Sequence, residues 1–201
     1  MPMNSPAFNL MRTLRLPRAA WMDLPTIAGL VGLDVVARIL PHAPDFTPVA
    51  ASALFAASAL RLRAFSVLVP ITAMLCADAV LGFYDFKMMA VVYGALAWPA
   101  LAASLCPRLR HPATTAPLLM SSSLVFFLVI NFAVWALSPI YPASAAGLLA
   151  CYVAALPFLK NMVAGDLFWG GALFGGYWLL QTLRAAPAAK TAAAVITRAR
   201  L

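Results

Sequence analysis

Long apolar runs, separated by short polar or proline-containing segments, fill the chain from Leu24 to Leu183. A helix that crosses a lipid bilayer needs about 20 mostly apolar residues, and most of these runs reach or approach that length. The pattern predicts an all-α membrane protein with a six-helix transmembrane domain over residues 24–184. We expect helices over Leu24–Leu40, Val49–Leu60, Ala64–Phe83, Met88–Cys106, Leu118–Leu137 and Phe158–Leu183.

Three segments do not fit a simple spanning pattern. The basic residues 1–23 lack a continuous apolar core before a cleavage site and predict a cytoplasmic lead-in, amphipathic over Phe8–Trp21, instead of a signal peptide. Tyr141–Leu156 is apolar but short and ends at Pro157, so it is interpreted as a helix lying at the outer surface. The alanine-rich residues 185–201 predict a loose cytoplasmic tail.

The composition favours a membrane protein over a soluble one. Hydrophobic residues make up 64% of 201 residues and charged residues 10%, whereas a soluble domain carries about a quarter charged residues. All six acidic residues are aspartates. The net charge of +8 does not indicate nucleic-acid binding, because basic residues at the ends of membrane helices set their orientation.

The basic residues are distributed unequally between the two sides of six alternating spans. With both termini in the cytoplasm, eleven of the 14 lysines and arginines fall on the cytoplasmic side. The three on the outer side are Arg38, Lys87 and Lys160. This asymmetry predicts a bacterial cytoplasmic membrane protein with both termini inside.

Ionisable residues within spans are costly and are therefore candidates for function. Asp34 and Arg38 are four residues apart on the first helix, so the sequence predicts that they pair, either as a structural ion pair or as part of a site. Asp78 lies near the outer end of the third helix, where it either belongs to a site or holds loop backbone in place.

Cys76 is the candidate for metal chemistry. It lies about two turns from the outer end of the third helix, on the face of Thr72 and Val80 and away from Asp78. A thiolate there would be a soft ligand for a transition metal, and the alternative is a packed small residue. Cys106 and Cys151 are interpreted as packing residues.

Polar and aromatic residues near the outer ends of the helices are candidates for a ligand pocket. The loop Pro41–Pro48 carries three prolines, which predicts a stiff lid. The chain has no phosphate-binding loop, no HExxH motif and no evident Ser/His/Asp set, so a nucleotide-driven pump and a conventional hydrolase are not supported. The candidate pocket residues are His42, Asp45, Asp78, Tyr84, Asp85, Asn131 and Tyr141.

The third helix ends in "LCADAVLGFYD" and the last begins at "LPFLKNMVAGD". With the polar loop and the short second helix before them, these segments resemble the substrate-binding S-components of energy-coupling factor (ECF) vitamin transporters over Leu24–Leu183. Among these, the chain looks most like the solitary cobalamin (vitamin B12) transporters of the BtuM type. The position of Cys76 matches the cysteine that ligates cobalt in that family.

The resemblance implies cobalamin or another corrinoid as the substrate, with Cys76 as an axial cobalt ligand. A thiolate in that position would weaken the bond to an upper cyanide, so removal of cyanide from cyanocobalamin is implied as a side activity. An ECF module is a possible partner that the solitary type does not require. The alternatives are an S-component for another vitamin or a metal ion, a membrane enzyme with Cys76 as nucleophile, and a scaffold without ligand.

Overall fold

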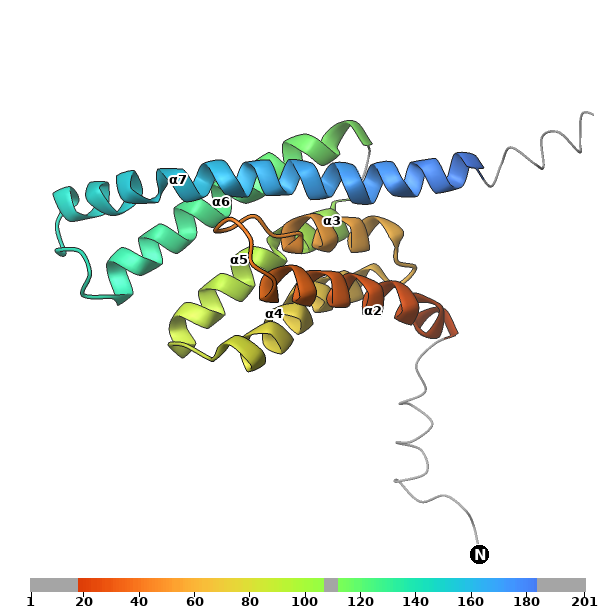
Figure 1. Cartoon of the computed structure of the whole chain (residues 1–201), viewed down its shortest axis with the longest axis horizontal. Coiled ribbons are helices and arrows are strands. Elements are labelled where there is room, and N and C mark those ends of the chain that lie inside the picture. The colour runs from red at the N-terminus through yellow and green to blue at the C-terminus, as the bar shows by residue number, and fades with distance from the viewer. Residues whose placement is uncertain (1–17, 107–111, 184–201) are drawn as a thin grey trace, which may run out of the picture.

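The computed structural model describes residues 18–106 and 112–183, and this part of the chain contains helices and no strand (Figure 1). Two short segments, the 3-10 turn η1 and the π turn η3, adjoin longer α-helices. The elements are α2 (Arg18–Ile39), α3 (Val49–Ala59), η1 (Arg63–Val67), α4 (Leu68–Leu81), α5 (Phe86–Leu105), α6 (Pro112–Leu137), α7 (Ala145–Gly170) and η3 (Gly171–Gly175).

Five helices are long and apolar enough to cross a membrane, and α3 is a shorter apolar helix. Large apolar side chains on their outer faces remain exposed, for example Phe86 at 80%, Leu105 at 77% and Val80 at 67%. A soluble protein rarely exposes continuous apolar surface on this scale. The fold is therefore that of an α-helical protein whose natural surroundings are apolar.

Helix α3 lies inside the bundle and holds its two halves together. It packs with α2 and α4 around Leu30 and Val69, and with α5, α6 and α7 around Leu119. Eight of its 11 residues are buried, and six of the 11 are alanine. Small side chains allow neighbouring helices to approach closely, which explains how a helix of about 16 Å is enclosed by longer ones.

The predicted break before Phe158 is wrong. One helix of 39 residues runs from Ala145 to Leu183, through Pro157 and the π turn η3. Ser144 caps its start by accepting a hydrogen bond from the amide of Gly147 at 3.1 Å. Pro157 removes one backbone hydrogen bond to Val153, and helices packed among neighbours in membranes tolerate this loss.

The first helix begins earlier than predicted, so part of the predicted lead-in is helical. It starts at Arg18 and includes Asp23, whose carboxylate accepts hydrogen bonds from the amides of Arg61 (3.1 Å) and Leu62 (2.9 Å). These bonds satisfy two backbone amides of the turn after α3. The buried carboxylate of Asp23 therefore has a structural role at this turn. The remainder of the lead-in and the predicted tail lie outside the described residues.

Other predicted boundaries agree to within six residues. Helix α4 ends at Leu81 and is followed by Gly82, whose φ of 106° is a conformation that favours glycine. Asp85 caps α5 by accepting a hydrogen bond from the amide of Met88 at 2.9 Å, so α5 starts two residues before the predicted Met88. Helix α6 begins six residues before the predicted Leu118, with Pro112 in its first turn, where proline is well tolerated.

Candidate functional site

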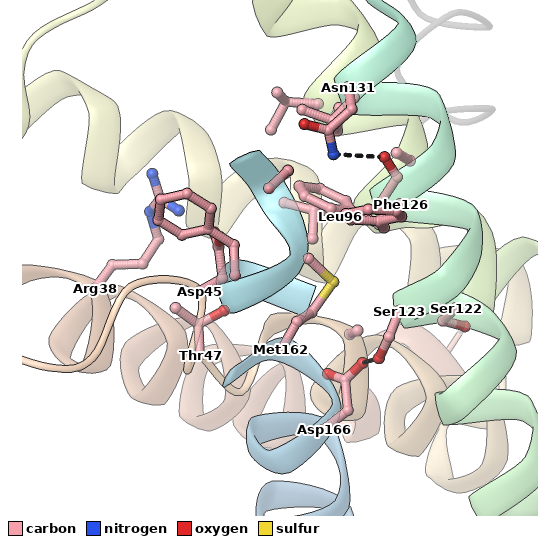
Figure 2. Close-up of a pocket in the computed structure, with 17 residues that line it drawn as sticks. Arg38, Asp45, Thr47, Leu96, Ser122, Ser123, Phe126, Asn131, Met162 and Asp166 are labelled. Carbon is pink, nitrogen blue, oxygen red and sulfur yellow. Dashed lines mark hydrogen bonds between the residues drawn. The ribbon is translucent and has the colours of Figure 1, made fainter. Parts of the chain in front are cut away.

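A cavity of about 330 Å³ lies among α3, α5, α6, α7 and the 41–48 loop. Its size is at the lower end of the range for small-molecule sites. In Figure 2 Asp166 and Ser123 lie at one end and Asn131 at the other, with Met162 and Phe126 between them. The chain therefore encloses space for a small molecule between helices that are otherwise tightly packed.

Asp166, on α7, is the most deeply buried acidic group on the cavity wall. Its side chain is 3% exposed, and its Oδ2 accepts a hydrogen bond from the hydroxyl of Ser123 on α6 at 2.6 Å. Gly170, one turn later on α7, packs its backbone against Leu119 of α6. Close packing of the two helices brings the carboxylate and the hydroxyl together at the side of the cavity.

Arg38 reaches the cavity from the end of α2 and is held by groups behind it. Its Nη2 donates to Asp78 Oδ1 of α4 at 3.2 Å, and Tyr93 of α5 donates to Asp78 Oδ2 at 2.7 Å. Asp78 is 2% exposed, so this ion pair is shielded on the carboxylate side. The guanidinium is therefore fixed in position and its charge is compensated.

The 41–48 loop covers one side of the cavity and packs directly on α7. A Cβ atom at Gly165 would lie 3.1 Å from the Cα of Phe46, so the backbones meet at a residue without a side chain. The ring of Phe46 also contacts Phe168, with centroids 5.6 Å apart. As a result, Asp45 and Thr47 of the loop line the cavity.

Asp45 occupies a turn with an unusual backbone conformation. Its φ is 61°, in the left-handed region that aspartate and asparagine adopt more readily than most residues. The amide of Phe46 donates to the carbonyl of Ala43 at 3.0 Å and closes the turn. Desolvation raises the pKa of Asp45 above its ordinary value, while the positive charges of Arg38 and His42 oppose this rise.

Residues 19–189 match a family described as a family of unknown function (DUF6580). The chain belongs to this family. No curated protein and no solved structure matches it. The family match includes every helix that lines the cavity, so the cavity belongs to the part of the chain that defines the family.

Two predicted pocket residues, Asp45 and Asn131, line the cavity. Asn131 is also used in packing, because its side-chain amide donates to the carbonyl of Phe127 at 2.7 Å. Buried Cys151 donates to the backbone carbonyl of Asn131 at 3.4 Å, which fits the packing role expected for this cysteine. Because its side-chain amide is already bonded to Phe127, Asn131 has fewer free hydrogen-bonding groups for a ligand than an unbonded asparagine would have.

Cys76 does not line the cavity. It is exposed, on the outward face of α4 that also carries Leu75 and Val80, while Ala77 and Asp78 are buried. The predicted separation of Cys76 from Asp78 around the helix agrees with this arrangement. Among the described residues, no group of three histidine, cysteine or acidic side chains is placed to hold a metal ion.

The other predicted pocket residues lie around the cavity or beyond it. His42 is exposed, with its Nδ1 2.7 Å from the carbonyl of Leu40. Tyr84 and Asp85 are exposed between α4 and α5 and do not line the cavity, nor does Tyr141 in the loop between α6 and α7. Asp78 supports the site from behind, through Arg38.

The predicted pairing of Asp34 with Arg38 is wrong. Asp34 is fully buried and its Oδ2 accepts the hydroxyl of Ser52 on α3, at 2.5 Å, while Arg38 pairs with Asp78. Positions four apart on a helix share a face, but a stronger partner on a neighbouring helix determines where each side chain points. Ser52 and Asp78 are partners that spacing within one helix does not identify.

Sequence interpretation missed the central residue, Asp166, although one signal was present. A carboxylate inside a membrane-spanning segment is itself a functional candidate, and Asp166 follows a glycine in the last apolar run. Ser123 and Met162 carry no signal of their own, because serine and methionine are common in membrane helices. The packing of α6 on α7 places Ser123 beside Asp166, whereas Met162 lies one turn before Asp166 on α7 itself.

Proposed function

We propose that this protein is a membrane uptake protein that binds a vitamin-sized solute in the cavity, as the substrate-binding S-components of ECF transporters do. The observation that carries the proposal is the cavity itself. It is lined by apolar helices, contains a few fixed polar groups and is covered on one side by the 41–48 loop. Ligand sites typically combine an apolar lining with a small number of oriented polar groups.

The path of the chain supports a bundle of six crossings. Both ends of the described chain lie on the same side of the bundle, at the right of Figure 1. Five crossings would leave them on opposite sides, so α3 counts as the sixth. It connects the 41–48 loop at one side to Arg61 and Arg63 at the other. Because α3 is surrounded by longer helices, it does not need about 20 apolar residues of its own to face lipid.

The arrangement of the basic residues supports an orientation with both termini in the cytoplasm of a bacterium. Arg61 and Arg63 then face the cytoplasm, and the 41–48 loop faces outward, where a solute arrives. A reporter that is active only in the periplasm, fused after Leu201, should give no signal. A strong signal would reverse the orientation and the direction from which the loop admits solute.

Cobalamin is the more specific candidate, and it depends on Cys76. In the structure Cys76 lies outside the cavity, and a corrinoid is much larger than a space of about 330 Å³. The geometry therefore favours a smaller solute, which was the alternative left open by the sequence. A cobalamin site would need a more open arrangement in which α4 contributes to the wall.

The visible spectrum of added cyanocobalamin tests this candidate. A thiolate from Cys76 would shift the cobalt absorbance and promote release of cyanide, and Cys76→Ser would abolish both, because a hydroxyl is a poor ligand for a soft metal. Cys106→Ser is the control. This cysteine is also exposed, but it follows the last residue of α5 and is not on α4. Identical spectra for wild type and Cys76→Ser would exclude cobalt ligation.

Filling the cavity tests the general proposal without knowledge of the solute. Met162→Trp adds volume at a buried position of the cavity wall, and Val80→Trp places the same side chain on an exposed face. Native mass spectrometry of protein purified in mild detergent should detect a bound small molecule in wild type and Val80→Trp, and not in Met162→Trp. An equal load of the same molecule in all three would show that the cavity is not the binding site.

A further inference from the structure

The acidic groups of the cavity outnumber its available positive charges. Arg38 is paired with Asp78, and in the ranges that the structure describes this is the one ion pair. Asp166 and Asp45 both line the cavity and have no such partner. Asp166 therefore faces the space with no cationic partner among the described residues, and Asp45 has no ion pair there, although Arg38 and His42 act on it electrostatically.

Asp166 makes this imbalance most costly. Among the described residues its one hydrogen bond is that from Ser123 to Oδ2, so none of their side chains or amides donates to Oδ1. Transfer of a carboxylate from water into a protein interior costs several kcal/mol even after relaxation of the surroundings. A ligand with a positive charge at this end of the cavity would remove that penalty, whereas an anion would increase it.

Aromatic rings complete a surface that suits a cation. Phe126, Phe127 and Phe158 line the same cavity, and Phe127 is fixed by a ring contact with Tyr152, with centroids 5.5 Å apart. The face of an aromatic ring attracts a positive charge, most strongly where water is excluded. Aromatic faces combined with one buried carboxylate distinguish a cationic group from a neutral group of the same shape.

We propose that the cavity selects an organic cation, such as a protonated amine or an azolium ring, with Asp166 as its counter-ion. The inference rests on the proposed function, because it names the class of solute for the same cavity. Ser123 keeps the carboxylate turned toward the cavity, and Asp45 adds negative charge beside the loop. The solute is thus drawn from the loop side toward the deeper of the two carboxylates.

Three probes with the same ring and different charge test the selection on the full-length protein in nanodiscs. Benzylamine is a cation at neutral pH, benzyl alcohol is neutral and benzoate is an anion, and all three are small enough for the cavity. Isothermal titration calorimetry should show benzylamine binding at least about tenfold more tightly than either of the others, as expected for a desolvated charge pair. Benzoate binding as tightly as benzylamine would overturn the inference.

A matched pair of variants assigns the effect to Asp166. Asp34 is also buried and bonded to a serine of the neighbouring helix, but it does not line the cavity. Asp166→Asn should weaken benzylamine binding at least about tenfold and leave benzyl alcohol unaffected, and Asp34→Asn should leave both unchanged. Equal benzylamine affinity in wild type and Asp166→Asn would refute the counter-ion role.

The wild-type comparison of the three probes remains decisive if Asp166→Asn does not fold, and Asp166→Glu, which keeps the charge, provides a second variant. Equal binding of benzylamine and benzyl alcohol would refute charge selection while leaving a solute site in the cavity. Binding of none of the probes would also refute the inference. A separate result tests the proposed function: it would be refuted if Met162→Trp retained the co-purified small molecule as wild type does.

Discussion

The two halves of the bundle use the same pair of side chains in different ways. On the side of α2, Asp34 accepts a hydrogen bond from Ser52 of α3 and is completely enclosed. On the side of α7, Asp166 accepts one from Ser123 of α6, but beside a cavity. An aspartate–serine bond between neighbouring helices is thus a packing contact in one half and part of a candidate site in the other.

The difference arises from the side chains that surround each pair. Asp34 faces α3, whose alanines allow close packing, and is fully buried, and Asp78 of the same half is bonded to both Arg38 and Tyr93. Asp166 faces a region where larger side chains, such as Phe126 and Met162, leave a gap. Burial of an ionisable group is therefore a poor guide to function until the free volume beside it is known.

The largest effect on stability is expected at the ion pair of the enclosed half. Arg38→Met leaves Asp78 with Tyr93 alone as a side-chain partner in the described part of the chain. It should lower the free energy of unfolding by about 2–3 kcal/mol, somewhat less than for a fully buried pair because Arg38 is 25% exposed. Thermal unfolding in detergent, followed by circular dichroism, measures the change. Lys87→Met, which removes a positive charge at an exposed position, is the control. An equal loss of stability in this variant would mean that the loss in Arg38→Met comes from the change in net charge and not from the broken ion pair.

The two serines offer the direct comparison between the halves. Ser52→Ala leaves the carboxylate of Asp34 without its donor inside a closed core and should cost about 2 kcal/mol. Ser123→Ala should cost about 1 kcal/mol or less, because Asp166 retains access to solvent or ligand in the cavity. Equal losses in the same unfolding assay would show that the two environments do not differ as the structure indicates.

A smaller effect is expected where the 41–48 loop meets α7. Gly165→Ala forces the backbone of Phe46 away by a few tenths of an ångström and should increase hydrogen exchange over 41–48. The net cost should be about 1 kcal/mol or less, because the better helix propensity of alanine offsets part of the overpacking. Gly94→Ala is the control, because a side chain there meets no atom within 4 Å. Unchanged exchange of the loop in Gly165→Ala would argue against its support by α7.

The smallest effect is expected at the exposed face of α4. Cys76→Ser should change the free energy of unfolding by less than about 0.5 kcal/mol, as is usual for surface positions. Cys151→Ser should cost more, because the thiol is buried between α6 and α7 and a serine there is harder to desolvate. A large loss in Cys76→Ser would place this residue in a contact that the monomer does not contain.

The helices were predictable because their main signal, apolar length, is local. Proline was the least reliable of the local signals: Pro157 predicted a break, whereas α7 continues through it because packing compensates for one missing hydrogen bond. The start of α2 was misplaced for a similar reason, since Asp23 looked like a residue outside the membrane until its backbone partners were known.

The site was less predictable because it depends on which helices touch. The sequence gives the angular position of Asp34, Arg38 and Asp78 on their own helices, but not the neighbour that each one meets. Asp166 stood out only as an acid in an apolar run. Conversely, Cys76 was prominent by its chemistry, and the structure places it on the outer surface of α4.

The 39 residues from Ala145 to Leu183 have a consequence for the surrounding lipid. A helix of that length extends about 58 Å, nearly twice the hydrocarbon thickness of a bilayer, and even a tilt of 40° would leave about 45 Å along the membrane normal. Such hydrophobic mismatch is relieved by local thickening of the bilayer or by projection of one end into the headgroup layer. The α6–α7 hairpin should therefore make this protein sensitive to lipid chain length, with thicker bilayers relieving part of the mismatch around α7.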